Sequence, residues 1–246
     1  MCGRFTLSVE PAILQAAFPD FAIPAGIKAR YNIAPSQPVL VLPNDGKQSA
    51  DYFVWGLIPM WARDATIGAR LINARAETLA EKSSFRGAYK YKRCLIFSDG
   101  FYEWKAQPGS GTIPAAGVRE KNKIPYHIHL SSGKPFAFAG LWDEWLSPDG
   151  SQIKSCTIIT TEPNALISTL HARMPVILPA EAYAEWLDPN PQKPETLQHL
   201  LVPYPAERMS AHPVSTLVNS PANDRPELLA PIPADKSTRD PQRDFS

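Results

Sequence analysis

The sequence predicts an α+β fold with a mainly antiparallel, barrel-like β core and peripheral short helices. Strand-like runs outnumber helical ones along the chain, and the two kinds do not alternate regularly. No segment repeats at a fixed period. The composition is 44% hydrophobic and 20% charged, which is typical of a globular protein with enough apolar residues for a core. These features together favour one α+β domain over a regular βαβ array.

The predicted strands are rich in β-branched and aromatic residues. In chain order they cover residues 38–42, 51–57, 93–97, 101–104, 126–130, 136–142, 155–161, 174–179 and 213–218. Cys94 and Cys156 fall inside two of these apolar runs, so we expect both to be buried packing residues. The spacing of the three cysteines, Cys2 included, indicates neither a disulfide framework nor a zinc cluster.

Helical signals are fewer than strand signals. Ser8 is expected to cap the first helix, in whose first turn Pro11 is tolerated. The expected helical segments are 9–18, 76–82, 162–170, 179–187 and 194–201.

The chain is expected to form a single domain over residues 2–229, followed by a proline-rich, disordered tail over 230–246. The opening "MCGRFTLSVEPAIL" has neither the basic start nor the long apolar run of a secretory signal. No apolar run reaches the roughly 18 residues of a membrane helix. We therefore expect a cytoplasmic protein with no membrane partner.

Cys2 stands directly after the initiator Met1. Methionine is normally removed before a small side chain, and removal would place an α-amine and a thiol on the same residue. The amine, with a pKa near 7.7 to 8.0, is partly unprotonated at neutral pH. The pair could close on an aldehyde as a thiazolidine, or the thiol could attack an acyl carbon with the amine as its base. The position alone is also compatible with an ordinary, frayed terminus.

Two further motifs carry polar residues in extended stretches. In "LINARAETL" a strand-like approach would put Asn73 and Arg75 on one face, where an amide can orient an amine and an arginine can hold a phosphate. In "FSDGFYEWK" the same alternation places Phe101 and Glu103 on one face of the strand. Tyr102 and Trp104 then lie on the other face. Burial of Glu103 among aromatic rings would raise its pKa and suit it to acid–base work.

The remaining polar motifs involve histidine. "LHARMPVIL" places His171 and Arg173 directly before an apolar strand, a common position for catalytic groups. His127 and His129 share one strand face in "YHIHL", but no third ligand has a recognisable spacing, so a metal site is not expected there. The sequence contains no phosphate-binding loop and no dinucleotide fingerprint.

Charge and aromatic residues hint at a nucleic-acid partner. The formal net charge of +1 does not indicate a nucleic-acid partner. The segment from Arg63 to Arg93, however, contains eight Lys or Arg residues and only three acidic residues. This stretch is either a solvated surface or a basic groove. The adjoining "WGLIPMWARD" is either a core plug or an apolar wedge that stacks on bases.

Seven motifs in register resemble the SRAP (SOS response-associated peptidase) family, and the resemblance spans about Cys2 to Leu229. In chain order they read "MCGRF", "YNIAPSQ", "WGLIPMW", "NARAET", "DGFYEW", "HARMP" and "PANDRPEL". Each motif is weak alone, but their common order behind an N-terminal cysteine is specific. The main departure is the long loop between Ala106 and Lys123, which leaves the motif residues intact.

The resemblance implies an enzyme that senses abasic sites in single-stranded DNA. It would link its terminal cysteine to the ring-opened sugar as a thiazolidine and so shield the lesion. The implied catalytic residues are Cys2 as nucleophile, Asn73 to position it, Glu103 as acid and base, and His171 for proton transfer. The implied DNA-binding residues are Arg4, Trp61, Arg75, Arg86, Trp104 and Arg173.

The same resemblance implies no cofactor and no metal, a monomer, nucleoid association while on DNA, possible strand-cleaving lyase activity and self-removal of Met1. Two alternatives remain. An N-terminal-nucleophile glutamine amidotransferase or hydrolase would explain Cys2 but would give no role to the tryptophan loop "WGLIPMW". A DNA-binding module without covalent chemistry would keep its affinity when Cys2 is lost.

Overall fold

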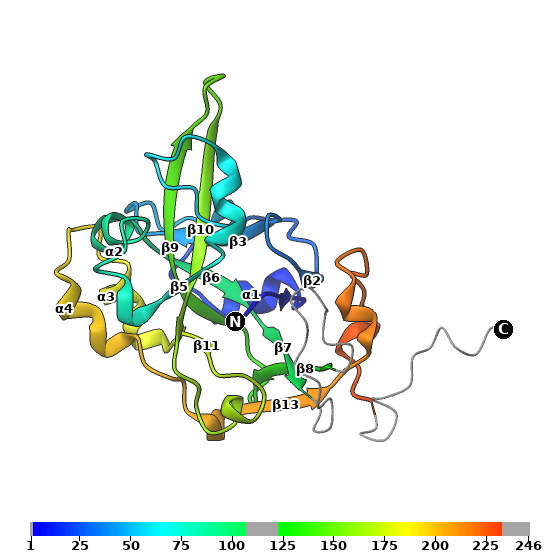
Figure 1. Cartoon of the computed structure of the whole chain (residues 1–246). Coiled ribbons are helices and arrows are strands. Elements are labelled where there is room, and N and C mark those ends of the chain that lie inside the picture. Colours follow the sequence, from blue (N-terminus) through cyan, green and yellow to red (C-terminus); the bar gives the residue numbers. More distant parts are fainter. Residues whose placement is uncertain (1, 107–122, 233–246) are drawn as a thin grey trace, which may run out of the picture.

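The computed structural model describes residues 2–106 and 123–232, and their strands form two sheets (Figure 1). The first sheet has the order β13-β8-β7-β1-β2, with every neighbouring pair antiparallel. Its strands are β1 (Phe5–Leu7), β2 (Arg30–Ile33), β7 (Gly100–Ala106), β8 (Lys123–Leu130) and β13 (Met209–Pro213). Residues 107–122, which hold most of the long loop noted in the sequence, lie outside the described residues.

The second sheet contains a closed ring of five strands. β10 pairs with β4, β4 with β3, β3 with β6, β6 with β9, and β9 again with β10. Three short strands, β5, β11 and β12, are added at its margins. The strands are β3 (Pro38–Pro43), β4 (Asp51–Trp55), β5 (Asn73–Arg75), β6 (Arg93–Ser98), β9 (Phe136–Leu146), β10 (Gln152–Thr161), β11 (Met174–Pro175) and β12 (Ile177–Leu178). The parallel pairs of β10 with β4 and with β5 are exceptions in a mainly antiparallel core, so the predicted fold class is confirmed.

Short helices lie outside this core (Figure 1). The α-helices are α1 (Pro11–Ala17), α2 (Arg86–Tyr91), α3 (Tyr183–Trp186) and α4 (Pro194–Leu197). The 3-10 turns are η1 (Ala65–Arg70), η2 (Ala76–Thr78), η3 (Ile167–Thr169), η4 (Ala180–Ala182), η5 (Gln198–Leu200), η6 (Ala206–Arg208), η7 (Thr216–Asn219) and η8 (Pro226–Leu229).

Several local predictions are wrong. Of the strand expected over 213–218, only Pro213 is a strand residue, as the last residue of β13, and η7 begins at Thr216. The reason is that Val214 and Val218 pack in a small second core instead of a sheet. Helices expected over 76–82 and 162–170 shrink to single 3-10 turns. Ser8 does not cap α1, whose N-cap is Glu10, because the Ser8 hydroxyl donates to the Asp99 carboxylate.

Strand β1 joins the chain's beginning to the barrel. The ring of Phe5 is fully buried and lies 5.1 Å from Trp55 of β4 and 5.7 Å from Phe138 of β9, centroid to centroid. Phe138 in turn contacts Phe101 of β7 edge-on at 6.0 Å. Aromatic contacts of this kind add about 0.5–1.5 kcal/mol each beyond area burial. Residues 2–4 are therefore held directly beside a rigid core.

The chain's other end folds back over the same region. Asn32 of β2 donates from Nδ2 to the carbonyls of Val218, Ser220 and Asn223, at 3.2, 3.0 and 2.7 Å. The backbone amides of Tyr31 and Asn32 both donate to the Asp224 carboxylate. The motifs "YNIAPSQ" and "PANDRPEL" thus bind one another across the fold.

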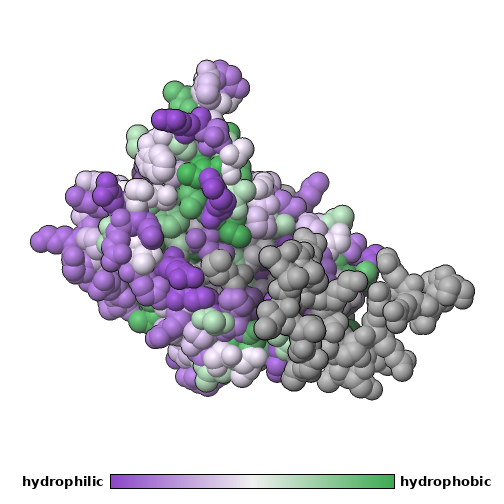
Figure 2. All heavy atoms as spheres, in the orientation of Figure 1, coloured by the Kyte–Doolittle hydropathy of each residue, from purple (hydrophilic) through white to green (hydrophobic). Residues whose placement is uncertain are grey.

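The predicted tail starts within the described chain. Ile232 N still donates to Pro213 O at 3.0 Å, and residues 233–246 lie outside the described residues. In the described ranges, no helix has the length and apolar character needed to cross a bilayer. Figure 2 shows apolar side chains gathered over β9 and β10 below the tip of their hairpin, whereas the surface over α2, α3 and α4 is mostly hydrophilic.

Candidate active site at Cys2

Cys2 is fully buried. Its thiol donates to the carbonyl oxygen of Arg4 at 3.8 Å, and that oxygen also accepts the backbone N–H of Tyr102 at 3.0 Å. The carbonyl oxygen of Cys2 accepts a hydrogen bond from Asn73 Nδ2 at 2.8 Å. The cysteine is therefore fixed from β7 on one side and from β5 on the other.

Asn73 reaches Cys2 because β5 alternates as the sequence predicts. Ala74 is buried against the core, while Asn73 and Arg75 face the other way, the first half-buried and the second exposed. The pairing of Asn73 with Ile158 fixes the register of β5 against β10 of the barrel. Asn73 Oδ1 is buried and has no hydrogen-bond partner within the described chain, so it retains an acceptor beside Cys2.

Glu103 lies on the face of β7 that the alternation predicts. Its neighbour Tyr102 packs in the small second core with Trp104, whereas Phe101 packs with Cys2 in the main core. Glu103 is only 2% exposed, and this burial raises its pKa to about 7. Because a carboxyl with this pKa exists in both protonation states at neutral pH, it can donate and accept a proton in one reaction.

The thiol and this carboxyl interact electrostatically. Burial, first, and then the negative charge of Glu103 raise the pKa of the Cys2 thiol well above its usual range. The thiol is therefore protonated at neutral pH, and a buried, protonated thiol reacts poorly with reagents in solution. Reaction at Cys2 needs a substrate held in place and a base that takes the thiol proton.

His171 and Arg173 lie in the segment that enters β11. The backbone N–H of Arg173 donates to His171 Nδ1 at 3.0 Å, and burial lowers the pKa of His171. The Arg173 guanidinium pairs with both carboxylate oxygens of Glu77 at 2.6 and 2.9 Å and donates to the carbonyl of Thr160 at 2.6 Å. Because Thr160 pairs with Arg75 of β5, this segment borders the strand that carries Asn73.

Arg4 and Trp104 have structural partners. Arg4 donates to Asn32 Oδ1 at 2.8 Å and to the carbonyls of Val218 and Asn219 at 2.7 and 3.2 Å. Trp104 Nε1 donates to Asn219 Oδ1 at 2.8 Å. Both side chains therefore hold the C-terminal segment against the strand that carries Glu103.

Trp61 and Arg86 line a separate pocket of about 580 Å³ beside α2 and β9. The "WGLIPMW" motif divides between the two predicted roles. Trp55, Leu57 and Ile58 are buried in the core, whereas Met60 and Trp61 are 69% and 56% exposed. Lys92 at the pocket wall forms an ion pair with Asp143, with 2.6 Å between Nζ and Oδ1.

The basic stretch from Arg63 to Arg93 is mostly surface. Six of its eight cations are exposed, namely Arg63, Arg70, Arg75, Lys82, Arg86 and Lys90. Arg93 is fully buried and donates to backbone carbonyls, among them those of Trp186 and Lys90 at 2.9 and 2.7 Å. Arg93 is therefore a core residue, and Cys94 and Cys156 are buried as predicted.

Sequence reasoning missed two groups of residues. Asn32 and Asp224, which tie the terminal motifs together, lie inside quoted motifs, but nothing in their spacing shows that they meet. His212 lies opposite His127 in the β8–β13 register and adds a third histidine to the pair on β8. No spacing along the chain indicates this third residue, because the pairing joins strands about 85 residues apart.

Fold, motifs and geometry agree with one family of proteins. The model of the SOS response associated peptidase (SRAP) family matches residues 1–221. The chain belongs to this family.

Relatives and solved structures support the assignment. The chain is 49% identical over 232 residues to the abasic site processing protein YoqW of Bacillus subtilis, covering 93% of this chain and 99% of that protein. It is 34% identical over 265 residues to the abasic site processing protein HMCES of Gallus gallus, covering 94% of this chain and 78% of that protein. A crystal structure of a protein from Bacteroides thetaiotaomicron superposes with a TM-score of 0.79 at 28% identity, covering 94% of this chain and 100% of that one.

Proposed function

We propose that this protein processes abasic sites in single-stranded DNA through a covalent thiazolidine bond between Cys2 and the ring-opened sugar. The observation that carries the proposal is the fixed position of Cys2 between Asn73 and a carboxyl of pKa about 7. The names of the relatives, abasic site processing proteins, give the substrate class. Removal of Met1, which the enzyme itself could catalyse, is required first because it frees the α-amine.

The first step opens the sugar and forms an imine. Glu103 accepts the proton of the sugar's anomeric hydroxyl and returns one to the ring oxygen, which exposes the aldehyde. The freed α-amine of Cys2, oriented by the available acceptor Asn73 Oδ1, attacks the aldehyde carbon, and one water leaves. His171, at the entrance to β11, assists the proton transfers. An imine at this carbon also permits β-elimination of the 3′ phosphate, which would be a lyase side reaction.

The second step closes the ring. The Cys2 sulfur bonds to the imine carbon as the thiol proton passes to Glu103, and the C=N double bond becomes a single bond. Glu103 then returns a proton to the nitrogen, which becomes a secondary amine. The raised pKa of the thiol makes this base necessary. Since both nucleophiles stand on one residue, the closure is intramolecular and gains the large effective concentration of a five-membered ring.

DNA would approach across the surface that carries the exposed cations. Arg75 is exposed two residues from Asn73, and Arg86 and Trp61 line the pocket beside α2. Arg173 would have to exchange its Glu77 partner for a phosphate. Arg4 and Trp104 would act through the C-terminal segment that they hold, or at its edge.

A denaturing gel tests the proposal directly. The protein is mixed with a single-stranded oligonucleotide that contains one abasic site, and with the matched oligonucleotide that contains none. We expect a heat-stable band of lower mobility with the abasic strand alone. An amidotransferase would hydrolyse glutamine and give no such band, and a noncovalent DNA-binding module would give none either.

Initial DNA binding should weaken with salt, since neutralised phosphates release counterions. For single strands the slope of log K against log salt is about −0.7 per phosphate contact. Arg75→Ala and Arg173→Ala should each flatten this slope by about 0.7, as measured by fluorescence anisotropy in several salt concentrations. Arg208→Ala, which changes an exposed arginine outside the seven motifs, is the control. If both variants show the same slope as the wild type, Arg75 and Arg173 do not contact phosphates.

A further inference from the structure

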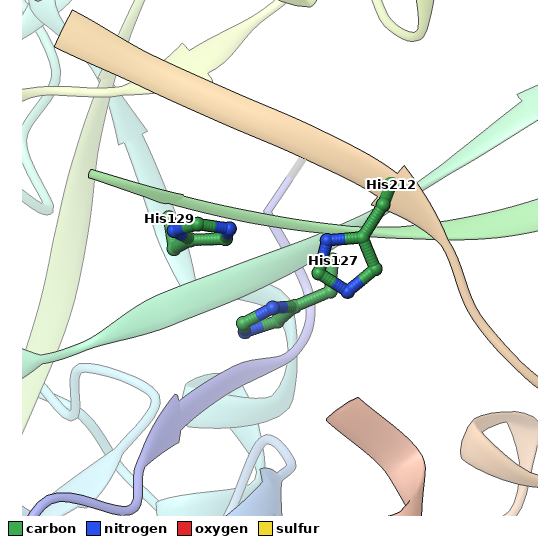
Figure 3. A group of neighbouring side chains, drawn as sticks. All are labelled: His127, His129 and His212. Atoms are coloured by element: carbon green, nitrogen blue, oxygen red, sulfur yellow. The ribbon is translucent and has the colours of Figure 1, made fainter. Parts of the chain in front are cut away.

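Three histidines converge on the first sheet (Figure 3). His127 and His129 come from β8, and His212 comes from β13, directly opposite His127. One ligand nitrogen from each ring lies within 4.8 Å of the other two. Tyr102 is the residue of β7 opposite His127, so the histidines share its face of the sheet, and Glu103 faces the other side.

Hydrogen bonds set the tautomers of the two half-buried rings. His129 Nδ1 lies 2.9 Å from the carbonyl oxygen of Leu130, and His212 Nε2 lies 2.9 Å from that of Leu229. A carbonyl oxygen only accepts, so each of these nitrogens carries a hydrogen. In the neutral form of imidazole that binds a metal, the lone pairs are therefore on His129 Nε2 and His212 Nδ1.

A similar argument fixes the buried ring of His127. Thr6 Oγ1 donates its single hydrogen to Asp99 Oδ1 at 2.5 Å, so toward His127 Nε2, 3.5 Å away, it can only accept. His127 Nε2 then carries the hydrogen, and its lone pair is on Nδ1. This Nδ1 is buried and has no hydrogen-bond partner among the described residues, a state that ordinarily costs about 1–3 kcal/mol.

The ring of His127 is also held in place. A Cβ atom on Gly100, whose neighbour Thr6 orients the ring, would lie 2.2 Å from His127 Nε2. Only glycine at position 100 leaves room for this ring.

We propose that His127, His129 and His212 bind a zinc ion that fastens β13 to β8. Neutral imidazoles are common ligands of zinc, at 2.0–2.1 Å in tetrahedral geometry. Each ring here donates its other N–H to oxygen, as metal-bound histidines generally do. The ion would draw the three nitrogens closer together, satisfy His127 Nδ1, and take water at a fourth position, which the half-buried His129 and His212 leave accessible.

The expected role is stabilisation of the C-terminal segment. β13 leads into residues 218–224, which Arg4 and Asn32 bind next to the candidate active site. This proposal does not depend on the proposed reaction with DNA. It concerns the other face of the sheet, and its test requires no DNA.

The test is a zinc titration of protein stripped with a chelator, followed by isothermal calorimetry and thermal unfolding. Both wild type and Cys2→Ser are titrated, because a terminal amine with a thiol also chelates metals. We expect one zinc per chain at the same affinity in both proteins. Zinc at 100 times its dissociation constant should raise the Tm by about 5 to 10 °C.

Variants in the Cys2→Ser protein locate the ion. His129→Ala and His212→Ala should each abolish this binding, whereas His199→Ala, at an exposed histidine of η5, should leave it unchanged. Co²⁺ provides a measurement that needs no histidine variant: it should give the visible absorption of a site of low coordination number, without a thiolate charge-transfer band. The proposal fails if neither zinc nor Co²⁺ binds, if zinc binding disappears in Cys2→Ser alone, or if it persists in both histidine variants.

Discussion

Cys2→Ser should leave no heat-stable crosslink with abasic single-stranded DNA, a loss beyond the detection limit of a denaturing gel. After methionine removal the variant still has an α-amine, held by the same Asn73 contact to its carbonyl oxygen. It should therefore form an imine and nick the strand by elimination, but no thiol is present to close the thiazolidine. The measurement is a gel of labelled DNA that resolves crosslinked, nicked and intact strands.

A second protein removes the amine and keeps the thiol. A non-removable extension before Cys2 converts the amine to an amide, so both the crosslink and the nick should disappear. Cys156→Ser, at a buried cysteine of β10, is the matched control and should crosslink as the wild type does once its folding has been verified. A stable adduct formed by the extended protein, or one mapped by mass spectrometry to another residue, would contradict the role of Cys2.

Glu103→Gln should slow crosslinking by about 10² to 10⁴-fold, the usual contribution of general acid–base catalysis. Glutamine keeps the size of the side chain and loses the proton that the sugar and the thiol exchange with the carboxyl. DNA affinity should change little, because the residue is 2% exposed. Single-turnover crosslinking rates and anisotropy measure the two effects separately. Glu81→Gln, at an exposed carboxylate, is the control.

The pH profile distinguishes catalysis from a structural effect. With a pKa of about 7, Glu103 is mostly protonated below pH 7 and mostly ionised above it. The ionised form, which takes the anomeric proton in ring opening and the thiol proton in ring closure, therefore increases as pH rises, and the reactive form of the terminal amine also increases up to its own pKa near 8. The wild-type rate should bend near pH 7, and Glu103→Gln should show the amine titration alone. A bend that persists in the variant would assign it to another group.

Local patterns in the sequence were sufficient for much of the fold. Alternation along 101–104 correctly separated Glu103 and Phe101 from Tyr102 and Trp104, because successive strand residues face opposite sides. The apolar runs around Cys94 and Cys156 are buried strands for the same reason. The failures are in the last expected strand and in the short helices. Val214 and Val218 are as apolar as strand residues, but they pack with Tyr102 and Leu228 in the small second core, and Val218 lies in the turn η7.

The sequence by itself determined the family, the α+β class and the residues Cys2, Asn73 and Glu103 as candidates, because these depend on order and local spacing along the chain. Only the tertiary structure decided which polar groups meet. It binds Arg4 to the carbonyl of Val218 and places His212 beside His127. It also buries Glu103, and that burial raises its pKa to about 7. Hydrogen bonds and desolvation depend on neighbours brought together from distant parts of the chain, and the chemistry of this site depends on both.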